Sequence, residues 1–139
     1  MNGAEKKPHF HVTAGIIRRN GKVLISRRPE GVHLEGFWEF PGGKREGFET
    51  LETCLARELR EELGIAVRPE AHLLTAEHEY PAKRVTLYFF SCRLLEETEP
   101  RGLEGQEIRW VRPEELLSYR FPPPDHRMIR DLQTSAETP

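Results

Sequence analysis

One segment, residues 50–64, constrains the possible fold of this chain more than any other. Residues 50–63 contain neither glycine nor proline and are rich in leucine, alanine, glutamate and arginine. Thr50 can accept a hydrogen bond in the first turn of a helix, and Gly64 can end the last turn. The sequence therefore predicts one well-bounded helix in the middle of the chain.

Strand signals lie on both sides of this helix. Phe10–Arg18 and Val23–Ser26 are rich in β-branched and apolar residues, and Asn20-Gly21 between them is typical of a tight hairpin turn. Further strands are expected at Phe37–Phe40, Leu73–Tyr80, Val85–Leu94 and Glu107–Val111, and shorter helices at Pro113–Leu117 and Asp125–Leu132. This order predicts an α/β fold in which helices pack on a mixed sheet.

The length of 139 residues suits a single domain with one core. We expect that domain to span residues 9–133. A disordered tail is expected before it, at residues 1–8, and a C-terminal tail after it, at residues 134–139. The sequence contains no repeat and no low-complexity linker that would indicate a second domain.

The composition argues against several kinds of partner. A net charge of −2 does not favour wrapping of polymeric nucleic acid. No apolar run approaches the ~20 residues that span a bilayer, and the first residues lack the apolar region of a signal peptide. Cys54 and Cys92 are too few for a disulfide framework. We expect a cytoplasmic monomer or weak dimer that binds a small molecule, not a membrane or polymeric nucleic acid.

The predicted helix has an acidic edge beside its apolar face. Because a helix advances by about 100° per residue, Glu58, Glu61 and Glu62 share an arc next to the apolar one. The apolar arc consists of Leu51, Leu55, Ala56, Leu59 and Leu63. Crowded carboxylates repel each other, and a hard divalent cation with oxygen ligands would relieve the repulsion. The alternative is a solvated charged surface relieved by Arg57 and Arg60.

The residues before the helix favour the metal site. Pro41-Gly42-Gly43 is expected to end the third strand, and its glycines allow the backbone to approach a ligand closely. Glu49 can pair with Arg57 across the junction between loop and helix, and thereby hold the neighbouring Glu58 in place.

These residues carry a family resemblance. The pattern Gly43-x5-Glu49-x7-Arg57-Glu58-Leu59-x-Glu61-Glu62-x-Gly64-Ile65 resembles the Nudix box at every defined position. The resemblance implies the Nudix fold, an α/β/α sandwich with a mixed sheet. It also implies hydrolysis of a nucleoside diphosphate linked to another moiety, with bound Mg²⁺ or, as a substitute, Mn²⁺.

The same resemblance assigns roles within the box. It makes Glu58 and Glu62 the central metal ligands, assisted by Glu61 and by the carbonyl group of Gly42. It also places Arg57 in the catalytic set, together with Glu58 and Glu61. Gly43, Glu49 and Gly64 are the structural positions of the box.

Outside the box, residues 10–133 resemble the MutT branch, whose members hydrolyse oxidised nucleotides. The matching segments are 14–17, 25–28, 38–44, 79–81, 105–107 and 121–123. This resemblance makes Glu104 a further metal ligand and a candidate general base. It assigns substrate contacts to Arg28, His33, Phe40, Tyr80, Lys83 and Asp125. Each of these residues also has a plainer interpretation, as core, exposed strand end, surface loop or helix cap.

The nucleobase depends on the position of Asp125. MutT has an asparagine there, which offers both a donor and an acceptor, whereas an ionised carboxylate only accepts. Asp125 could accept from the N7–H of 8-oxoguanine or from the amino group of cytosine. The sequence therefore predicts release of a nucleoside monophosphate and pyrophosphate from 8-oxo-dGTP, or alternatively from CTP, dCTP or a 5-substituted dCTP. Less favoured alternatives are a non-catalytic Nudix-fold module that binds 8-oxoguanine and an enzyme acting on a sugar nucleotide or dinucleotide.

Overall fold

The computed structural model describes residues 6–137. Residues 1–5 and 138–139, which belong to the two expected tails, lie outside the described residues. The first strand begins at His9 and the last helix ends at Glu137, four residues beyond the expected end of the domain at residue 133. No helix within residues 6–137 is long and apolar enough to cross a membrane.

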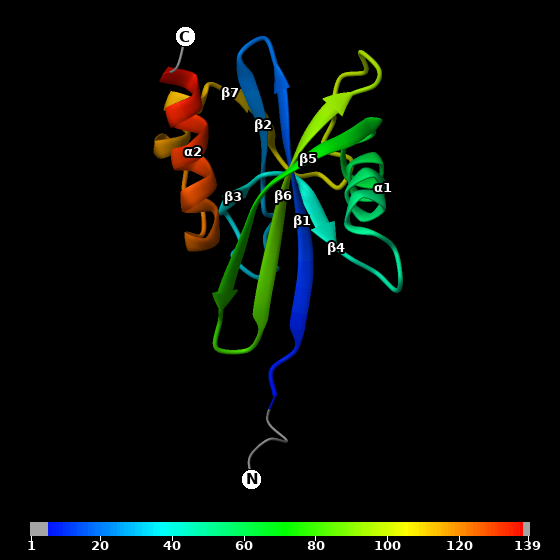
Figure 1. Ribbon diagram of the computed structural model, residues 1–139, viewed down its shortest axis with the longest axis vertical. Coiled ribbons are helices and arrows are strands. Elements are labelled where there is room, and N and C mark those ends of the chain that lie inside the picture. Colours follow the sequence, from blue (N-terminus) through cyan, green and yellow to red (C-terminus); the bar gives the residue numbers. More distant parts are fainter. Residues whose placement is uncertain (1–5, 138–139) are drawn as a thin grey trace.

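A mixed sheet forms the centre of the molecule (Figure 1). Within the described residues its strands are β1 (His9–Arg19), β2 (Lys22–Arg27), β3 (Trp38–Glu39), β4 (Gly42–Lys44), β5 (Val67–Glu79), β6 (Arg84–Leu94) and β7 (Ile108–Val111). The order is β3-β2-β1-β6-β5, with β4 paired to β1 and β7 paired to β2. Strands β1 and β6 are parallel and the other pairs are antiparallel, which confirms the predicted mixed sheet.

Helices cover both faces of this sheet, as Figure 1 shows. Helix α1 (Leu51–Leu63) packs on one face. Helix α2 (His126–Glu137) covers the other face, together with the short 3-10 helices η2 (Pro113–Ser118) and η3 (Pro123–Asp125). The α/β/α sandwich is therefore confirmed.

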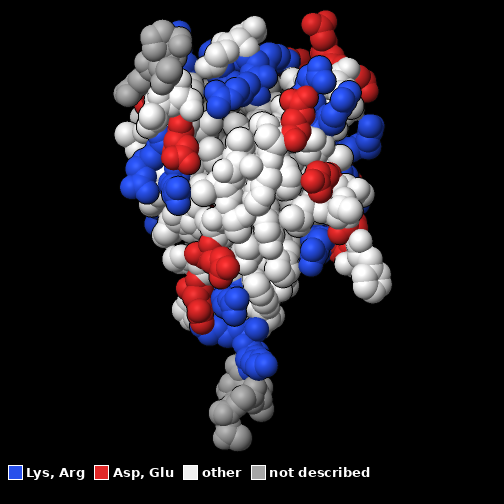
Figure 2. Space-filling model, in the orientation of Figure 1, with Lys and Arg blue, Asp and Glu red and all other residues white. Residues whose placement is uncertain are grey.

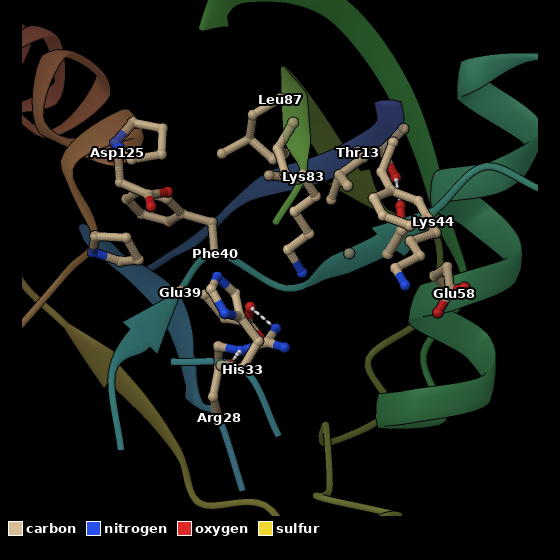
Figure 3. A pocket seen from close by; sticks show the side chains of 18 of the residues that line it. Thr13, Arg28, His33, Glu39, Phe40, Lys44, Glu58, Lys83, Leu87 and Asp125 are labelled. Atoms are coloured by element: carbon tan, nitrogen blue, oxygen red, sulfur yellow. Dashed lines mark hydrogen bonds and ion pairs between the residues drawn. The ribbon is translucent and has the colours of Figure 1, made fainter. Parts of the chain in front are cut away.

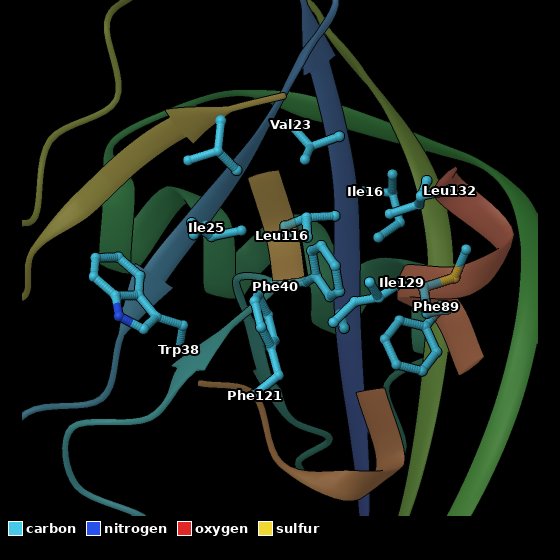
Figure 4. Close-up of a cluster of buried hydrophobic side chains, with 13 residues drawn as sticks. Ile16, Val23, Ile25, Trp38, Phe40, Phe89, Leu116, Phe121, Ile129 and Leu132 are labelled. Atoms are coloured by element: carbon cyan, nitrogen blue, oxygen red, sulfur yellow. The ribbon is translucent and has the colours of Figure 1, made fainter. Parts of the chain in front are cut away.

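Successive residues of the central strands point to opposite faces, so each strand contributes to two cores. Ile16 and Phe89 belong to the cluster on the α2 side, which also contains Ile129 (Figure 4). The next residues along the chain, Ile17 and Phe90, pack on the other side. That second cluster contains the predicted apolar face of α1, with Leu55, Leu59 and Leu63 buried. Burial on both faces explains why these strands are nearly continuous apolar runs.

The predicted turn and helix ends are confirmed. Asn20 and Gly21 both have positive φ, 54° and 76°, as a type I′ hairpin turn requires. The Thr50 hydroxyl accepts a hydrogen bond from the backbone N–H of Thr53 at 3.0 Å. Gly64 has the left-handed conformation, with φ 69°, and its N–H donates to the Arg60 carbonyl at 3.0 Å.

Two sheet segments differ from the prediction. Strand β3 ends at Glu39, before Pro41, and Gly42–Lys44 then pairs with β1 as strand β4, so the two glycines do not simply stop a strand. Strand β5 begins at Val67, six residues before Leu73. Its first part has mainly exposed side chains, contains Pro69 and is interrupted by register shifts, features that an edge strand tolerates.

The face seen in Figure 2 carries charges of both signs. Lysine and arginine lie near aspartate and glutamate around its edge, and its centre is largely uncharged. On this face, therefore, positive and negative side chains are interspersed.

The left-handed conformation at Gly64 yields a stability prediction. Replacing Gly64 by alanine should lower the free energy of unfolding by about 1 kcal/mol, because a Cβ atom is disfavoured at φ 69°. Urea unfolding monitored by circular dichroism measures this change. Gly64→Asn is the matched control and should cost less, because asparagine tolerates this conformation better. Equal stability of the alanine variant and the wild type would contradict the cap assignment.

Candidate active site

A pocket of about 360 Å³ lies where β1, β3, β4 and the β5–β6 hairpin meet α1 and η3. Figure 3 shows its two ends. Glu58, on α1, lies at one end, and Asp125, at the end of η3, lies at the other. Lys83 lies between them. The pocket is therefore elongated and differs in chemistry from one end to the other.

At the α1 end, the carboxyl groups of Glu58 and Glu62 line the pocket. The pKa of the Glu62 carboxyl is raised by burial, by a hydrogen bond with Glu58 and by the charges of Glu58, Glu39 and Glu104. Crowded carboxylates of this kind suit a divalent cation, which would compensate their charge with oxygen ligands. The donor set therefore fits the metal that the sequence predicts.

The backbone of β4 adds to this fit. A Cβ atom on Gly43 would overlap the Glu58 carboxyl group, so only glycine lets this carboxyl lie against the strand. The Pro41 carbonyl accepts a hydrogen bond from β1, and the Arg45 N–H donates one to β1. In an antiparallel pair every second residue hydrogen-bonds to the partner strand in this way. Gly42 and Lys44 are the alternate residues, which do not form these hydrogen bonds with β1. The Lys44 carbonyl accepts a hydrogen bond from Arg57 on the edge of β4 that faces away from β1, and Gly42 lines the pocket.

Arg57 connects the loop before α1 to the acidic helix edge. Its guanidinium donates two hydrogen bonds to the Glu49 carboxylate, at 2.6 and 3.0 Å. It also contacts Glu58 at 3.1 Å and Glu61 at 3.2 Å. The two-point geometry fixes the orientation of the guanidinium, so Arg57 holds Glu58 at the pocket as the sequence predicts.

The other two predicted metal ligands lie further out. The Glu61 side chain is 57% exposed and turns toward Arg57. Glu104 is exposed on a loop that is tied to the end of α1, where Leu103 N–H and the Gln106 side chain both donate to the Glu62 carbonyl. Within residues 6–137, no three acidic, histidine or cysteine side chains converge closely enough to hold an ion by themselves. Of the predicted metal ligands, Gly42, Glu58 and Glu62 line the pocket together.

Arg28 and Lys83 line the middle of the pocket, and Lys44 lies toward its α1 end. Arg28, predicted to bind substrate, donates to Glu39 at 3.0 Å and to the His33 carbonyl at 2.6 Å. The pKa of Lys83 is lowered by burial and by the charges of Lys44 and Arg28. The positive charges of these side chains repel one another, and a bound polyphosphate would offset that repulsion. The middle of the pocket therefore suits an anionic chain of phosphates.

The far end of the pocket combines aromatic and apolar side chains with Asp125. Phe40 is buried against Phe121, with ring centroids 5.2 Å apart, so it belongs to the core as well as to the pocket wall. His33 contacts the Tyr80 ring edge-on, with centroids 4.7 Å apart. Its pKa is lowered by burial and by Lys83 and Arg28, so a neutral imidazole faces this rim. All six predicted substrate residues line this one pocket.

The pocket also contains residues that the sequence did not predict, among them the charged residues Glu39 and Lys44. Glu39 lies beside the pocket as the partner of Arg28, and Lys44 extends from β4. A charged residue within the aromatic segment 37–40 is a signal that could have indicated Glu39. Lys44 depends on the pairing of β4 with β1, for which the sequence offers no local signal.

The geometry agrees with the family comparison. The NUDIX domain family matches residues 12–131. The chain therefore belongs to the Nudix family, and it is a Nudix hydrolase acting on nucleoside triphosphates.

Individual relatives place the chain in the MutT-type branch. It is 39% identical over 129 residues to an 8-oxo-dGTP diphosphatase from Haemophilus influenzae, covering 91% of this chain and 93% of that protein. It is 37% identical over 116 residues to a CTP pyrophosphohydrolase from Escherichia coli, covering 84% and 85%. The crystal structure of a MutT protein from Methanosarcina mazei matches with a TM-score of 0.83 and 25% identity, covering 96% of this chain and 99% of that one.

The Glu49–Arg57 pair yields a pH prediction. The hydrogen bond from Arg57 lowers the pKa of Glu49 from 4.5 to about 2. A lowered carboxyl pKa contributes stability that is present above pH 4.5 and is lost as the pH falls toward 2. We expect Glu49→Gln to lower the melting temperature at pH 6, and we expect the difference from wild type to shrink below pH 4.5. Glu52→Gln, on the exposed side of α1, is the control; a difference for Glu49→Gln that stayed constant with pH would contradict the assignment.

Proposed function

We propose that this protein is a Mg²⁺-dependent pyrophosphohydrolase that converts 8-oxo-dGTP into 8-oxo-dGMP and pyrophosphate. The observation that carries the proposal is the order of groups along one pocket. Carboxylates lie at one end, cations in the middle and an aromatic end with Asp125 beyond them. A nucleoside triphosphate presents the complementary order of metal-bound phosphates, further phosphate oxygens and base.

In this proposal Glu58 and Glu62 hold the metal ion, with the Gly42 carbonyl as a further ligand. A metal ion held by these residues would offset the negative charge of the phosphates and lower the pKa of a water molecule. Arg57 orients Glu58, and Glu61 assists at the exposed edge. The family resemblance implies that water attacks the β-phosphorus. The bond between the β-phosphorus and the oxygen that bridges it to the α-phosphorus then breaks. That oxygen leaves with the nucleoside monophosphate, and the β- and γ-phosphates leave as pyrophosphate.

Glu104 is the proposed general base that takes the proton from the attacking water. Its carboxylate lies close enough to Glu62 and Glu39 to raise the pKa of both. Its loop is anchored to the end of α1 through Leu103 and Gln106. Within the described residues it has no cation partner that would compete for its lone pairs. Arg28, Lys44 and Lys83 stabilise the charge that develops on the phosphates.

A cytosine nucleotide is the second candidate substrate. One relative with extensive coverage is a CTP pyrophosphohydrolase, and the carboxyl group of Asp125 can bind the cytosine amino group. The catalytic end of the pocket would work in the same way on either nucleotide. The two candidates therefore differ only in the base that occupies the Asp125 end.

Replacing Glu58 tests the catalytic end. Glu58→Gln should fold normally but lose several orders of magnitude in kcat, because the amide cannot supply the charge of a metal ligand. Steady-state release of pyrophosphate measures the loss. Glu52→Gln on the same helix removes the same charge away from the pocket and should keep wild-type activity. Wild-type turnover in Glu58→Gln would overturn the metal assignment.

A panel of nucleotides tests the substrate. With Mg²⁺, 8-oxo-dGTP, dGTP, dCTP, 5-methyl-dCTP and CTP are compared by kcat/KM, with ADP-ribose as a non-triphosphate control. We expect 8-oxo-dGTP to exceed dGTP by at least about tenfold, since the hydrogen bonds at one base edge are worth about 1–3 kcal/mol. Chelation of the metal should abolish all turnover. Equal rates for 8-oxo-dGTP and dGTP would rule out the proposed base.

A further inference from the structure

Asp125 is an unusual group to find at the base end of the pocket. It is only 3% exposed, lies between Pro124 and the first turn of α2, and still lines the cavity. Its backbone N–H donates to the Pro122 carbonyl at 3.0 Å, which fixes the turn that presents the side chain. Within residues 6–137 no hydrogen bond or ion pair engages its carboxyl group. Because Asp125 lines the cavity, a ligand bound there can supply the hydrogen-bond partners that the protein does not.

The charged groups around Asp125 do not stabilise a carboxylate. Glu39, on β3, is negative and repels it electrostatically. Tyr80, after β5, faces it as a phenol, and the pKa of that phenol is raised by burial and by Asp125. Arg28, which directly follows β2, is a nearby cation, and it is already paired with Glu39 at 3.0 Å.

The two lysines of the pocket are engaged elsewhere. Lys44 lies over the Phe10 ring, with its Nζ 4.2 Å from the ring centroid, and Lys83 lies 5.6 Å from the same centroid. Figure 3 shows Asp125 at the end of the pocket opposite Lys44. Burial, followed by the charge of Glu39, therefore raises the pKa of Asp125 well above its ordinary value. These surroundings favour the protonated carboxyl group.

We propose that Asp125 recognises the base as a neutral carboxylic acid, donating through its O–H and accepting through its C=O. This inference rests on the proposed function. A carboxylic acid offers one donor beside one acceptor, which is the same pair of functions that an amide side chain offers. Asp125 thus performs the task of an asparagine at this position.

This assignment defines a class of bases. The O6 and N7–H groups of 8-oxoguanine form an acceptor beside a donor, and so do the N3 and amino groups of cytosine. Ordinary guanine presents two acceptors, O6 and N7, at the corresponding edge. A neutral Asp125 is complementary to the first two edges and mismatched to the third. One side chain therefore accounts for both candidate substrates.

An ionised Asp125 would have a different preference. A carboxylate has no donor, so it would repel O6 of 8-oxoguanine or N3 of cytosine. The two states therefore predict opposite effects of pH. Recognition by the neutral acid is present below the pKa of Asp125 and is lost as the pH rises through it. Recognition by the carboxylate would instead strengthen with rising pH.

The test compares wild type with Asp125→Asn, which keeps the donor and acceptor but does not titrate. The dissociation constants of 8-oxo-dGMP and dCMP are measured without metal between pH 5 and 10. We expect the ratio of wild-type to Asp125→Asn affinity to fall by about tenfold per pH unit above the pKa of Asp125. Ionisation of the nucleotide cancels in this ratio. Asp125→Ala, which offers neither function, should weaken binding by about ten- to a hundredfold at low pH.

The outcomes separate this inference from the proposed function. Hydrolysis of 8-oxo-dGTP or dCTP by wild type, combined with a ratio that is flat or rises with pH, would overturn the neutral acid only. Failure of wild type to hydrolyse either triphosphate with Mg²⁺ would overturn the proposed function, even where the ratio falls. Melting temperatures of the three proteins establish that each is folded over the pH range.

Discussion

The concentration of carboxyl groups at the end of α1 is the constraint on which the rest of the site depends. Glu58 and Glu62 both line this end of the pocket, and burial together with the charges of Glu58, Glu39 and Glu104 raises the pKa of Glu62. Such an arrangement is unstable without compensation. Arg57 supplies part of it, held by two hydrogen bonds from its guanidinium to Glu49. A divalent cation would supply the remainder, so the energetic cost of the cluster in the free protein favours metal binding.

The same constraint explains the spacing of the family pattern. Glu49 lies two residues before α1 and Arg57 is the seventh residue of the helix, so their pairing closes the loop that carries β4 toward the helix. Gly43 then brings backbone against the Glu58 carboxyl, where a side chain would overlap it. Thr13 and Cys54 donate to the Gly43 carbonyl from β1 and α1. Strand, loop and helix are thus joined around one carboxylate.

The sequence predicts what is local and leaves open what depends on distant pairing. Helix α1 and its caps follow from signals within fifteen residues, since Thr50 and Gly64 act on their own turns. Strand β4 was not predicted because its partner, β1, lies about thirty residues away. Glu39 was missed because its importance comes from contact with Arg28 inside a pocket. The residue list of the site came from family resemblance, and tertiary structure was needed to show that Glu58 and Glu62 converge while Glu61 remains exposed.

The two ends of the pocket handle buried carboxyl groups in different ways. At the α1 end, carboxyl groups lie beside Arg57 and can bind a cation, so their negative charge has a use there. At the η3 end, Asp125 lies among prolines and aromatic rings, and the charge of Glu39, another carboxyl group, raises its pKa. Adding a negative charge there would oppose both burial and the phosphates of the substrate. The pocket therefore favours charge at the end proposed to bind the metal and hydrogen bonding without charge at the end proposed to bind the base. Chemically similar side chains acquire different roles because their surroundings differ.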